Sequence, residues 1–276
     1  MVFQAASEKL PTEYGSKVTV QTTNTNILGA RYHKSFIGPI TANRLLKRFD
    51  DPELVYQADE KDVCAIEGIT QRQIRSILEN GSLESAYKIM EDCEKNNIFI
   101  LPQNDLLYPK RAKEPEDSPV VLYYKGCLQN VEKTVGIVGA RRCTQEAKFQ
   151  AVKITEKYVI EDIAIISGMA KGIDSYAHTA CLRAGGYTVA ILGNGLDICY
   201  PSEHKKLMEH IAEKGLLISE YPPGTEPAQY RFPRRNRLIS AWSDKLIVIS
   251  PGKGSGAFIT AEYEKKYGRE VELFYL

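Results

Sequence analysis

The chain has 276 residues, of which 43% are hydrophobic and 26% are charged, values typical of a soluble globular protein. Its 36 basic and 35 acidic side chains leave a net charge of +1, which excludes attraction of the whole surface to nucleic acid or membrane. No apolar run approaches the ~20 residues of a membrane helix. The start, MVFQAASEKLP, lacks the pattern of a signal peptide. We therefore expect a soluble, cytoplasmic protein without membrane contact.

The 6 cysteines are scattered along the chain and form no CxxC pair, and no HExxH motif is present. Dispersed cysteines are typical of reduced thiols in a cytosolic protein, so a zinc site built on cysteines is disfavoured. His204 and His210 are too far apart in sequence to share a helix face. We expect neither a metal ion nor another cofactor.

The first part of the chain is polar and then becomes helical. Residues 1–25 are expected to form a flexible lead-in, with one short strand at Lys17–Gln21. Apolar residues then recur at helical spacing in ITANRLLKRF (40–49) and ITQRQIRSIL (69–78). Residues 26–93 are therefore predicted to form a small helical domain of the sterile-alpha-motif or helix-hairpin-helix kind. Its glycine turns could meet DNA phosphates, but we favour an ordinary helix-packing module.

The pattern changes again in residues 94–276. IFILP (98–102) and VVLYYKG (120–126) each predict a strand. After Lys133, short apolar strands alternate with helices, which is typical of parallel βαβ units. These strands are expected at residues 134–139, 163–168, 187–193, 216–220, 245–250 and 270–276. The fold class is therefore α/β, an extended Rossmann-like, doubly wound parallel sheet that follows the small helical domain.

Glycine-rich loops follow four of the predicted strands: VGARRCT (138–144), SGMAKGID (167–174), LGNGLD (192–197) and SPGKGSG (250–256). Loops at the carboxyl ends of parallel strands meet at one edge, and the helix starts behind them favour phosphate. None contains GxxxxGK[ST], and the first lacks GxGxxG, so nucleotide hydrolysis and classical NAD binding lack their signatures. The candidate binding residues in these loops are Gly139, Arg141, Arg142, Ser167, Gly168, Lys171, Gly172, Lys253 and Ser255.

The most basic segment is YRFPRRNRLIS (230–240), which no acid interrupts between Glu226 and Asp244. Its candidate binding residues are Arg231, Phe232, Arg234, Arg235, Asn236 and Arg237. Arginine pairs with phosphate, and the rings of Tyr230, Phe232 and Trp242 could stack on unpaired bases, so the segment predicts a loop for single-stranded nucleic acid. Two alternatives stay open. The loop is merely solvated over a core Phe and Trp, or Asn236 and Arg237 tie it to the sheet.

Catalytic constellations are weak. Asp174 and His178 could form an acid–base pair, but we favour a reading in which Asp174 braces a helix start and His178 packs against a neighbouring loop. Ser167 and Ser255 have no evident general base. We therefore predict no catalytic residue and a protein that is not an enzyme.

Four stretches together resemble the bacterial DNA-processing protein A family, DprA or Smf. They are IVGARRCT, IISGMAKGIDSYAHTACLRAGGYTVAILGNGLDICYPSEH, LISEYPPGTEPAQYRFPRRNRLIS and GSGAFITAE, and they cover most of residues 134–269. The resemblance implies single-stranded DNA binding without strong sequence preference and delivery of that DNA to the RecA recombinase in natural transformation. It also implies a DNA pocket that uses Arg141, Lys171 and the segment from Phe232 to Arg237.

The chain departs from the family pattern at two places. Lys253–Gly254–Ser255–Gly256 stands where the family usually has Arg-Ser-Gly-Ser, so one arginine is lost or replaced by Lys253. The family also continues beyond the sixth strand, whereas this chain ends at Leu276. We therefore expect either a monomer with a frayed final strand or a homodimer that pairs through a different surface.

Two rival functions remain. PGKGSGAFITAE (251–262) distantly resembles a loop of the phosphoribohydrolases, which favours a Rossmann-fold nucleotide-binding enzyme or sensor, although Glu262 lies too far along. The second rival function is that of a scaffold without nucleic-acid or nucleotide binding. The DNA-binding reading predicts that Arg235→Glu removes most single-strand binding and leaves the fold intact.

Overall fold

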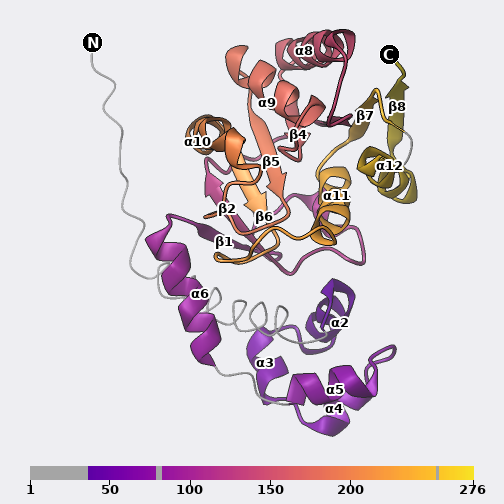
Figure 1. Ribbon diagram of the computed structural model, residues 1–276. Coiled ribbons are helices and arrows are strands. Elements are labelled where there is room, and N and C mark those ends of the chain that lie inside the picture. Colours follow the sequence, from indigo (N-terminus) through magenta and orange to yellow (C-terminus); the bar gives the residue numbers. More distant parts are fainter. Residues whose placement is uncertain (1–36, 79–82, 253–254) are drawn as a thin grey trace.

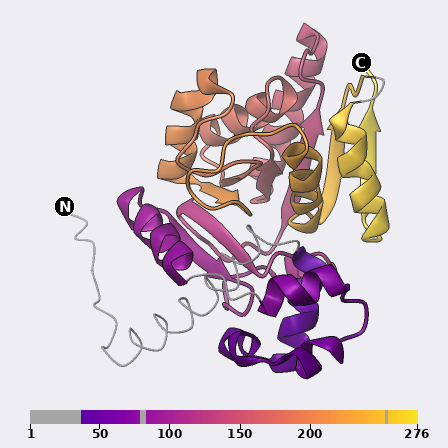
Figure 2. The ribbon, with the colours of Figure 1, turned by 60° about the horizontal axis from the view of Figure 1, so that its bottom comes forward.

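The computed structural model describes residues 37–78, 83–252 and 255–276. The predicted lead-in over residues 1–25, its short strand and Lys253 lie outside these ranges. Helices come first, then a mixed sheet with helices on both faces (Figures 1 and 2). An α/β chain with a Rossmann-like sheet preceded by helices is therefore confirmed. No helix in the described ranges combines the length and apolar character needed to cross a bilayer.

The amino-terminal helices are short and joined by tight turns. They are α2 Pro39–Phe49, α3 Pro52–Gln57, α4 Glu60–Cys64, α5 Gln71–Leu78 and α6 Leu83–Lys95. Helix α2 begins with Pro39 in its first turn, where the missing N–H costs no hydrogen bond. Asp59 caps α4 by accepting a hydrogen bond from the Asp62 N–H at 2.9 Å. The assignment of these helices to a domain that ends at residue 93 stays a prediction.

An eight-stranded sheet forms the second part, with strand order β1-β2-β6-β5-β4-β3-β7-β8. Strands β3 to β8 run parallel, whereas β2 pairs antiparallel with both β1 and β6. The strands are β1 Phe99–Pro102, β2 Val121–Gly126, β3 Thr134–Gly139, β4 Ala164–Ser167, β5 Thr188–Leu192, β6 Leu216–Ser219, β7 Lys245–Ile249 and β8 Glu270–Phe274. Each strand expected between residues 94 and 276 is present, and β8 lies at an edge.

Helices cover both faces of the sheet. Alternate residues of β5 show this, because Val189 and Ile191 pack with α11 residues in one core cluster, while Ala190 and Leu192 pack with α10 residues in another. Helices α8 and α9 pack beside α10 on its face, and α12 packs against α11. The helices are α7 Lys110–Lys113, α8 Gln145–Ile160, α9 Ile173–Arg183, the 3₁₀ turn η1 Ser202–His204, α10 Lys205–Lys214, α11 Arg231–Ala241 and α12 Gly256–Lys266.

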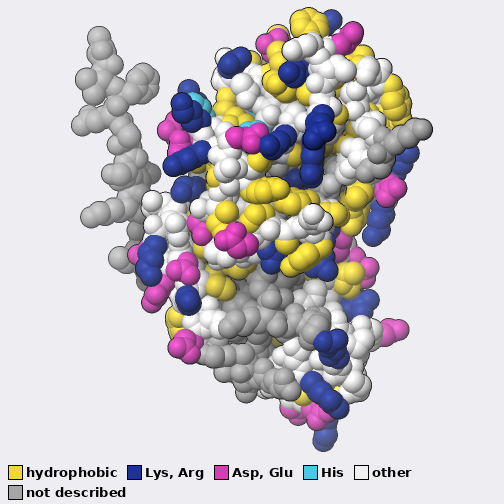
Figure 3. Space-filling view, viewed as in Figure 1, with side chains coloured by type: hydrophobic (Ala, Val, Ile, Leu, Met, Phe, Trp, Pro, Cys, Tyr) yellow, Lys and Arg dark blue, Asp and Glu magenta, His cyan; other side chains and the backbone are white. Residues whose placement is uncertain are grey.

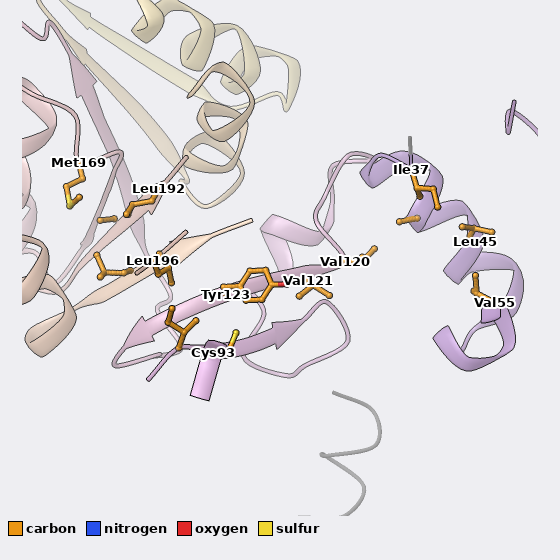
Figure 4. Packing of buried hydrophobic residues seen from close by; sticks show 14 of the residues in the cluster. Ile37, Leu45, Val55, Cys93, Val120, Val121, Tyr123, Met169, Leu192 and Leu196 are labelled. Atoms are coloured by element: carbon orange, nitrogen blue, oxygen red, sulfur yellow. The ribbon is translucent and has the colours of Figure 1, made fainter. Parts of the chain in front are cut away.

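One core cluster links the two parts of the molecule. Buried residues of α2 and α3, including Leu45 and Val55, belong to the same cluster as Val121 and Tyr123 of β2 (Figure 4). A polar contact adds to this junction, because the Asn43 side chain donates a hydrogen bond to the Ser118 carbonyl at 2.7 Å. The amino-terminal helices are thus packed onto the sheet rather than tethered to it.

The order of the strands fixes where a ligand site belongs. From β3 the chain adds β4, β5 and β6 on one side, and then returns to place β7 and β8 on the other. The direction of winding therefore reverses between β3 and β7, and open α/β sheets bind ligands in the crevice at such a reversal.

Candidate nucleic-acid interface

A groove of about 640 Å³ opens at the reversal between β3 and β7. The loop after β3, with Gly139, Arg141 and Arg142, forms one wall, and Ser255 and Gly256 at the start of α12 form another. The amino-terminal half of α11 closes the third side. Three glycine loops predicted from the sequence thus approach one another, counting the loop after β4, which reaches the groove through Ala170. We call this depression the strand-end groove.

A smaller cavity of about 70 Å³ lies beside the strand-end groove, among the loops after β4 and β5. Gly168, Lys171 and Asn194 are among the residues that line the cavity but not the groove. The residues that line both hollows are Arg141, Ala170, Tyr200, Phe232 and Arg235. Because they share these walls, the two hollows lie next to each other. In the space-filling view, several Lys and Arg side chains lie above a band of hydrophobic surface that crosses the middle of the molecule, and acidic side chains adjoin the same band (Figure 3).

Two aromatic rings stand at the boundary between the cavity and the groove. Tyr200 and Phe232 stack with ring centroids 5.3 Å apart and planes 23° apart. The Arg141 guanidinium lies 6.0 Å from the centre of the Phe232 ring. Tyr200 is 46% exposed, so this pair offers an aromatic surface on which an unpaired base can stack. Phe232 was predicted for this role, whereas Tyr200 was missed, although its Tyr-Pro dipeptide follows a strand-end loop.

Glycine is required where the loops after β3 and β4 meet. Gly172 precedes α9 with φ of 80°, and a Cβ on it would lie 2.2 Å from the Ala140 carbonyl oxygen. A larger residue would clash and adopt strained backbone. Gly172 therefore positions Arg141 and Lys171 by holding their loops together, and it is absent from the lining of both hollows.

The segment predicted to be an arginine-rich loop is helix α11. This corrects the sequence analysis, and the helical period then sorts its side chains onto two faces. Phe232, Arg235 and Asn236 line the strand-end groove. Arg231, Arg234 and Arg237 instead line a second groove, of about 680 Å³, between α11 and α2. The four arginines therefore do not form one basic surface.

Two members of this second set, the half-buried Arg231 and the exposed Arg234, contact aromatic rings. The Arg231 guanidinium lies 5.2 Å from the centre of the Tyr221 ring and 5.3 Å from that of Tyr230. Arg234 lies 5.6 Å from the centre of the Tyr230 ring. Tyr230, considered at first as a base-stacking residue, thus belongs to the second groove. Trp242 is buried in the core, with its ring 6.4 Å from that of Tyr108.

Arg235 is a buried structural cation rather than an exposed phosphate ligand. Only 5% of it is exposed, and its Nη1 donates hydrogen bonds to the carbonyls of Gly168, at 2.6 Å, and Ile191. Burial lowers the pKa of Arg235 to about 10, while the nearby Asp174 acts in the opposite direction. This burial argues against the expectation that Arg235→Glu leaves the fold intact, because the substitution would place a carboxylate against two carbonyl oxygens.

Arg237 and Asn236 fasten α11 to its neighbours, as one of the open alternatives proposed. The Arg237 guanidinium makes ion pairs with Glu220, at 2.6 Å, and Asp117, at 3.4 Å, and its side chain is 6% exposed. The Asn236 side-chain amide donates a hydrogen bond to the Gly256 carbonyl at 3.0 Å. Asn236 thereby holds the amino-terminal end of α12 against the strand-end groove.

The two predicted serines have different positions. Ser167 is fully buried, and its hydroxyl donates to the Ile137 carbonyl at 2.6 Å, so its side chain is not available to a ligand in this structure. Ser255 lines the strand-end groove and caps α12 by accepting a hydrogen bond from the Ala257 N–H at 3.2 Å.

The residues considered for catalysis have structural contacts. Asp174 accepts hydrogen bonds from the Gly168 and Ala170 N–H groups, as the favoured reading predicted. The expected contact of His178 with a loop is wrong, because its Nδ1 lies 2.7 Å from the hydroxyl of Thr188 in strand β5. Burial lowers the pKa of His178 to about 3, so the ring stays neutral. Glu262 is exposed and absent from the lining of both hollows. Among the described residues, no three His, Cys, Asp or Glu side chains gather as a metal site would require.

Comparison with known proteins agrees with the resemblance seen in the sequence. A family model described as DNA recombination-mediator protein A matches residues 99–275. Protein Smf of Synechocystis sp. is 36% identical over 240 residues, which are 85% of this chain and only 60% of that relative. DNA processing protein DprA of Streptococcus pneumoniae is 36% identical over 231 residues, which are 74% of this chain and 82% of that protein.

Solved structures extend the similarity to the fold. The X-ray structure of DprA from Streptococcus pneumoniae matches with a TM-score of 0.75 and 31% identity, over 91% of this chain and 86% of that one. DNA processing protein A from Helicobacter pylori, studied for its single-stranded DNA binding mode, matches with a TM-score of 0.59 and 29% identity, over 64% of this chain and 80% of that one. This chain therefore belongs to the DNA recombination-mediator protein A family.

Proposed function

We propose that this chain binds single-stranded DNA across the strand-end groove and delivers it to the RecA recombinase during the uptake of DNA. One observation carries the proposal: the exposed Arg141 and Arg142 and the stacked pair of Tyr200 and Phe232 lie around the same depression. Cations along a backbone path, together with rings for the bases, are the combination that single strands require. Family membership and the Helicobacter pylori relative support the same reading.

The phosphate contacts follow from what lines the groove. Arg141 and Arg142 are exposed on the loop after β3, and Lys171 is exposed on the loop after β4. The start of α12, with Ser255 and Gly256, adds the positive end of a helix dipole. Arg235 is a buried positive charge in the wall of the groove. It keeps its hydrogen bonds to the Gly168 and Ile191 carbonyls when DNA binds.

Single strands are favoured over duplex because of the aromatic pair. Tyr200 and Phe232 stand between the cavity and the groove, and a ring can stack on a base face only where that base is unpaired. A duplex would present its phosphates to Arg141 and Arg142 but keep its bases from the rings. Little sequence preference is expected, since every base has a face on which to stack.

A salt titration tests the binding step. Fluorescence anisotropy with a labelled oligo(dT) and with a duplex of equal length would be measured at several salt concentrations. We expect tighter binding of the single strand, and a log–log salt slope of about −0.7 for each phosphate contacted. Equal or tighter binding of the duplex, or a slope near zero, would overturn the proposal.

Delivery to RecA needs a separate measurement. RecA assembly on single-stranded DNA already coated by a single-strand-binding protein would be followed by its ATPase rate, with and without this chain. We expect the chain to shorten the lag, and an Arg141→Ala variant that binds DNA weakly to shorten it less. An unchanged lag with a chain that binds DNA well would leave the binding function and remove the delivery role.

A further inference from the structure

The short segment between β5 and α10 contains the sequence YPSEH (200–204). Of these residues, only Tyr200 has a role in the proposed binding of DNA. In this segment Pro201 lines the smaller cavity, and η1 follows directly. His204 Nδ1 lies 3.0 Å from the Met169 carbonyl oxygen, which fixes η1 to the loop after β4. Glu203 lies between Pro201 and His204 in the sequence. These contacts therefore hold it beside Lys171.

Glu203 and Lys171 form an ion pair at the mouth of the smaller cavity. The Lys171 ammonium nitrogen lies 2.6 Å from Glu203 Oε2, and their side chains are 54% and 56% exposed. The hydrogen bond from Lys171 holds the pKa of Glu203 below its usual value, so Glu203 is ionised at neutral pH. The carboxylate thus takes one of the three N–H donors of Lys171 and offsets the charge that a phosphate would otherwise contact.

This acid is set apart from the other carboxylate of the site. Within the described residues, Asp174 is the acid that lines either hollow, and its carboxylate accepts two backbone hydrogen bonds at the loop after β4. Asp174 is also buried, whereas Glu203 is exposed and contacts a cation that a ligand can reach. Glu203 is therefore the carboxylate that a DNA phosphate would meet first at Lys171.

We propose that Glu203 is an internal competitor for Lys171, which the phosphate of a bound strand displaces, and that it thereby lowers the affinity of the site. This inference rests on the proposed binding of single-stranded DNA. Since the pair is exposed, its loss on binding costs little, of the size of a surface ion pair. The competitor would weaken binding modestly and make the Lys171 contact easier to exchange along a strand.

The alternative is that Glu203 simply repels the negative backbone. A double-mutant cycle separates the two mechanisms. If Glu203 acts by occupying Lys171, Glu203→Gln tightens binding only while Lys171 is present. If it acts by general repulsion, Glu203→Gln tightens binding by the same factor in a Lys171→Gln background.

The experiment measures anisotropy with labelled oligo(dT) for the wild type, Glu203→Gln, Lys171→Gln and the double variant, each checked for folding by circular dichroism. Glu213→Gln, an exposed acid near the carboxyl-terminal end of α10, is the charge-matched control. We expect Glu203→Gln to tighten binding about twofold to fivefold, with no gain in the Lys171→Gln background and none for Glu213→Gln.

The possible failures are distinguishable. A wild-type chain that does not bind oligo(dT) would overturn the proposed function and this inference with it. A wild type that binds, combined with no gain in Glu203→Gln or with an equal gain in both backgrounds, would overturn only the role of Glu203. Glu203→Ala gives a second variant in case the amide itself finds a new partner in the cavity.

Discussion

The two faces of α11 have the same kind of residues and different surroundings. One face, with Phe232, Arg235 and Asn236, lies against the strand-end groove, and the other, with Arg231, Arg234 and Arg237, lies against the groove toward α2. On each face one arginine is buried, and its charge is committed to carbonyls or carboxylates. The comparison shows that position on a helix, rather than the number of arginines in the segment, decides which cations a ligand can reach.

The strand-end face differs from the other in what lies opposite to it. Glycine loops with exposed cations of their own, Arg141 and Arg142, face the strand-end side. The carboxylates of Asp117 and Glu220 and the ring of Tyr221 lie on the other side. Asp117 and Glu220 pair with Arg237 and offset part of the positive charge of the second groove, so a negative strand is attracted more strongly to the first environment. DNA is therefore expected on one face of α11 only.

The largest expected effect is on stability, at the buried arginine of the strand-end face. Arg235→Glu should lower the free energy of unfolding by about 3–5 kcal/mol, because it places a carboxylate against the Gly168 and Ile191 carbonyls and beside Asp174. The urea midpoint measures the loss. Arg142→Glu, the same charge change on an exposed side chain, should shift the free energy by about 0.5 kcal/mol or less. An unchanged midpoint for Arg235→Glu would contradict the structural role.

The next effect is on binding at the exposed cation of the same groove. Arg141→Ala should weaken single-strand binding about tenfold to a hundredfold, as expected for a lost hydrogen bond between charged groups. The log–log salt slope should become shallower by about 0.7. Arg183→Ala, an exposed residue in the last turn of α9, is the control and should retain both values. A normal slope in the Arg141 variant would show that this side chain does not contact phosphate.

Two tyrosines, one at each groove beside α11, allow the two faces to be compared without any change of charge. Tyr200→Ala should weaken single-strand binding about tenfold, since one base loses an aromatic partner. Tyr230→Ala removes an exposed ring from the other face of α11 and should change the affinity less than about twofold. Anisotropy titrations of the two variants measure these changes in single-strand affinity. Equal losses would place DNA on both faces.

The smallest expected effect concerns the support of the groove. Asn236→Ala removes the hydrogen bond to the Gly256 carbonyl and should cost about 1 kcal/mol of folding stability. The start of α12 then loosens, and single-strand binding should weaken about twofold. Thermal melting and anisotropy on the same samples measure both quantities. A loss of binding larger than that of Arg141→Ala would indicate that Asn236 contacts DNA directly.

The strands and their glycine loops could be predicted because their signals are local. Each parallel strand, such as Lys245–Ile249, is a short apolar run that ends before a turn, and the rules of parallel sheets then bring the loops to one edge. The reversal between β3 and β7 follows from the same rhythm once the strand order is known. Arg141 and Lys171 could be found from their place in these loops alone.

Helix α11 could not be predicted in the same way. Its first residues, RFPRRN, contain a proline and no apolar residue at helical spacing, while Leu238 and Ile239 come only later. Proline is compatible with a first turn, so the segment is helical although it has the composition of a loop. Tyr200 was missed because its partner, Phe232, is remote in sequence, and only the folded chain brings the rings to 5.3 Å.

The most direct test of where DNA binds compares two double variants that each remove two arginines from one of the two grooves. Arg141→Ala/Arg142→Ala acts on the strand-end groove, and Arg231→Ala/Arg234→Ala acts on the groove toward α2. In salt-titrated binding of oligo(dT), the first should weaken affinity by about a hundredfold or more and flatten the slope by about 1.4. The second should keep the slope and stay within about threefold of the wild-type affinity. Equal losses in the two variants, or the larger loss in the second, would contradict the placement of DNA on one face of α11.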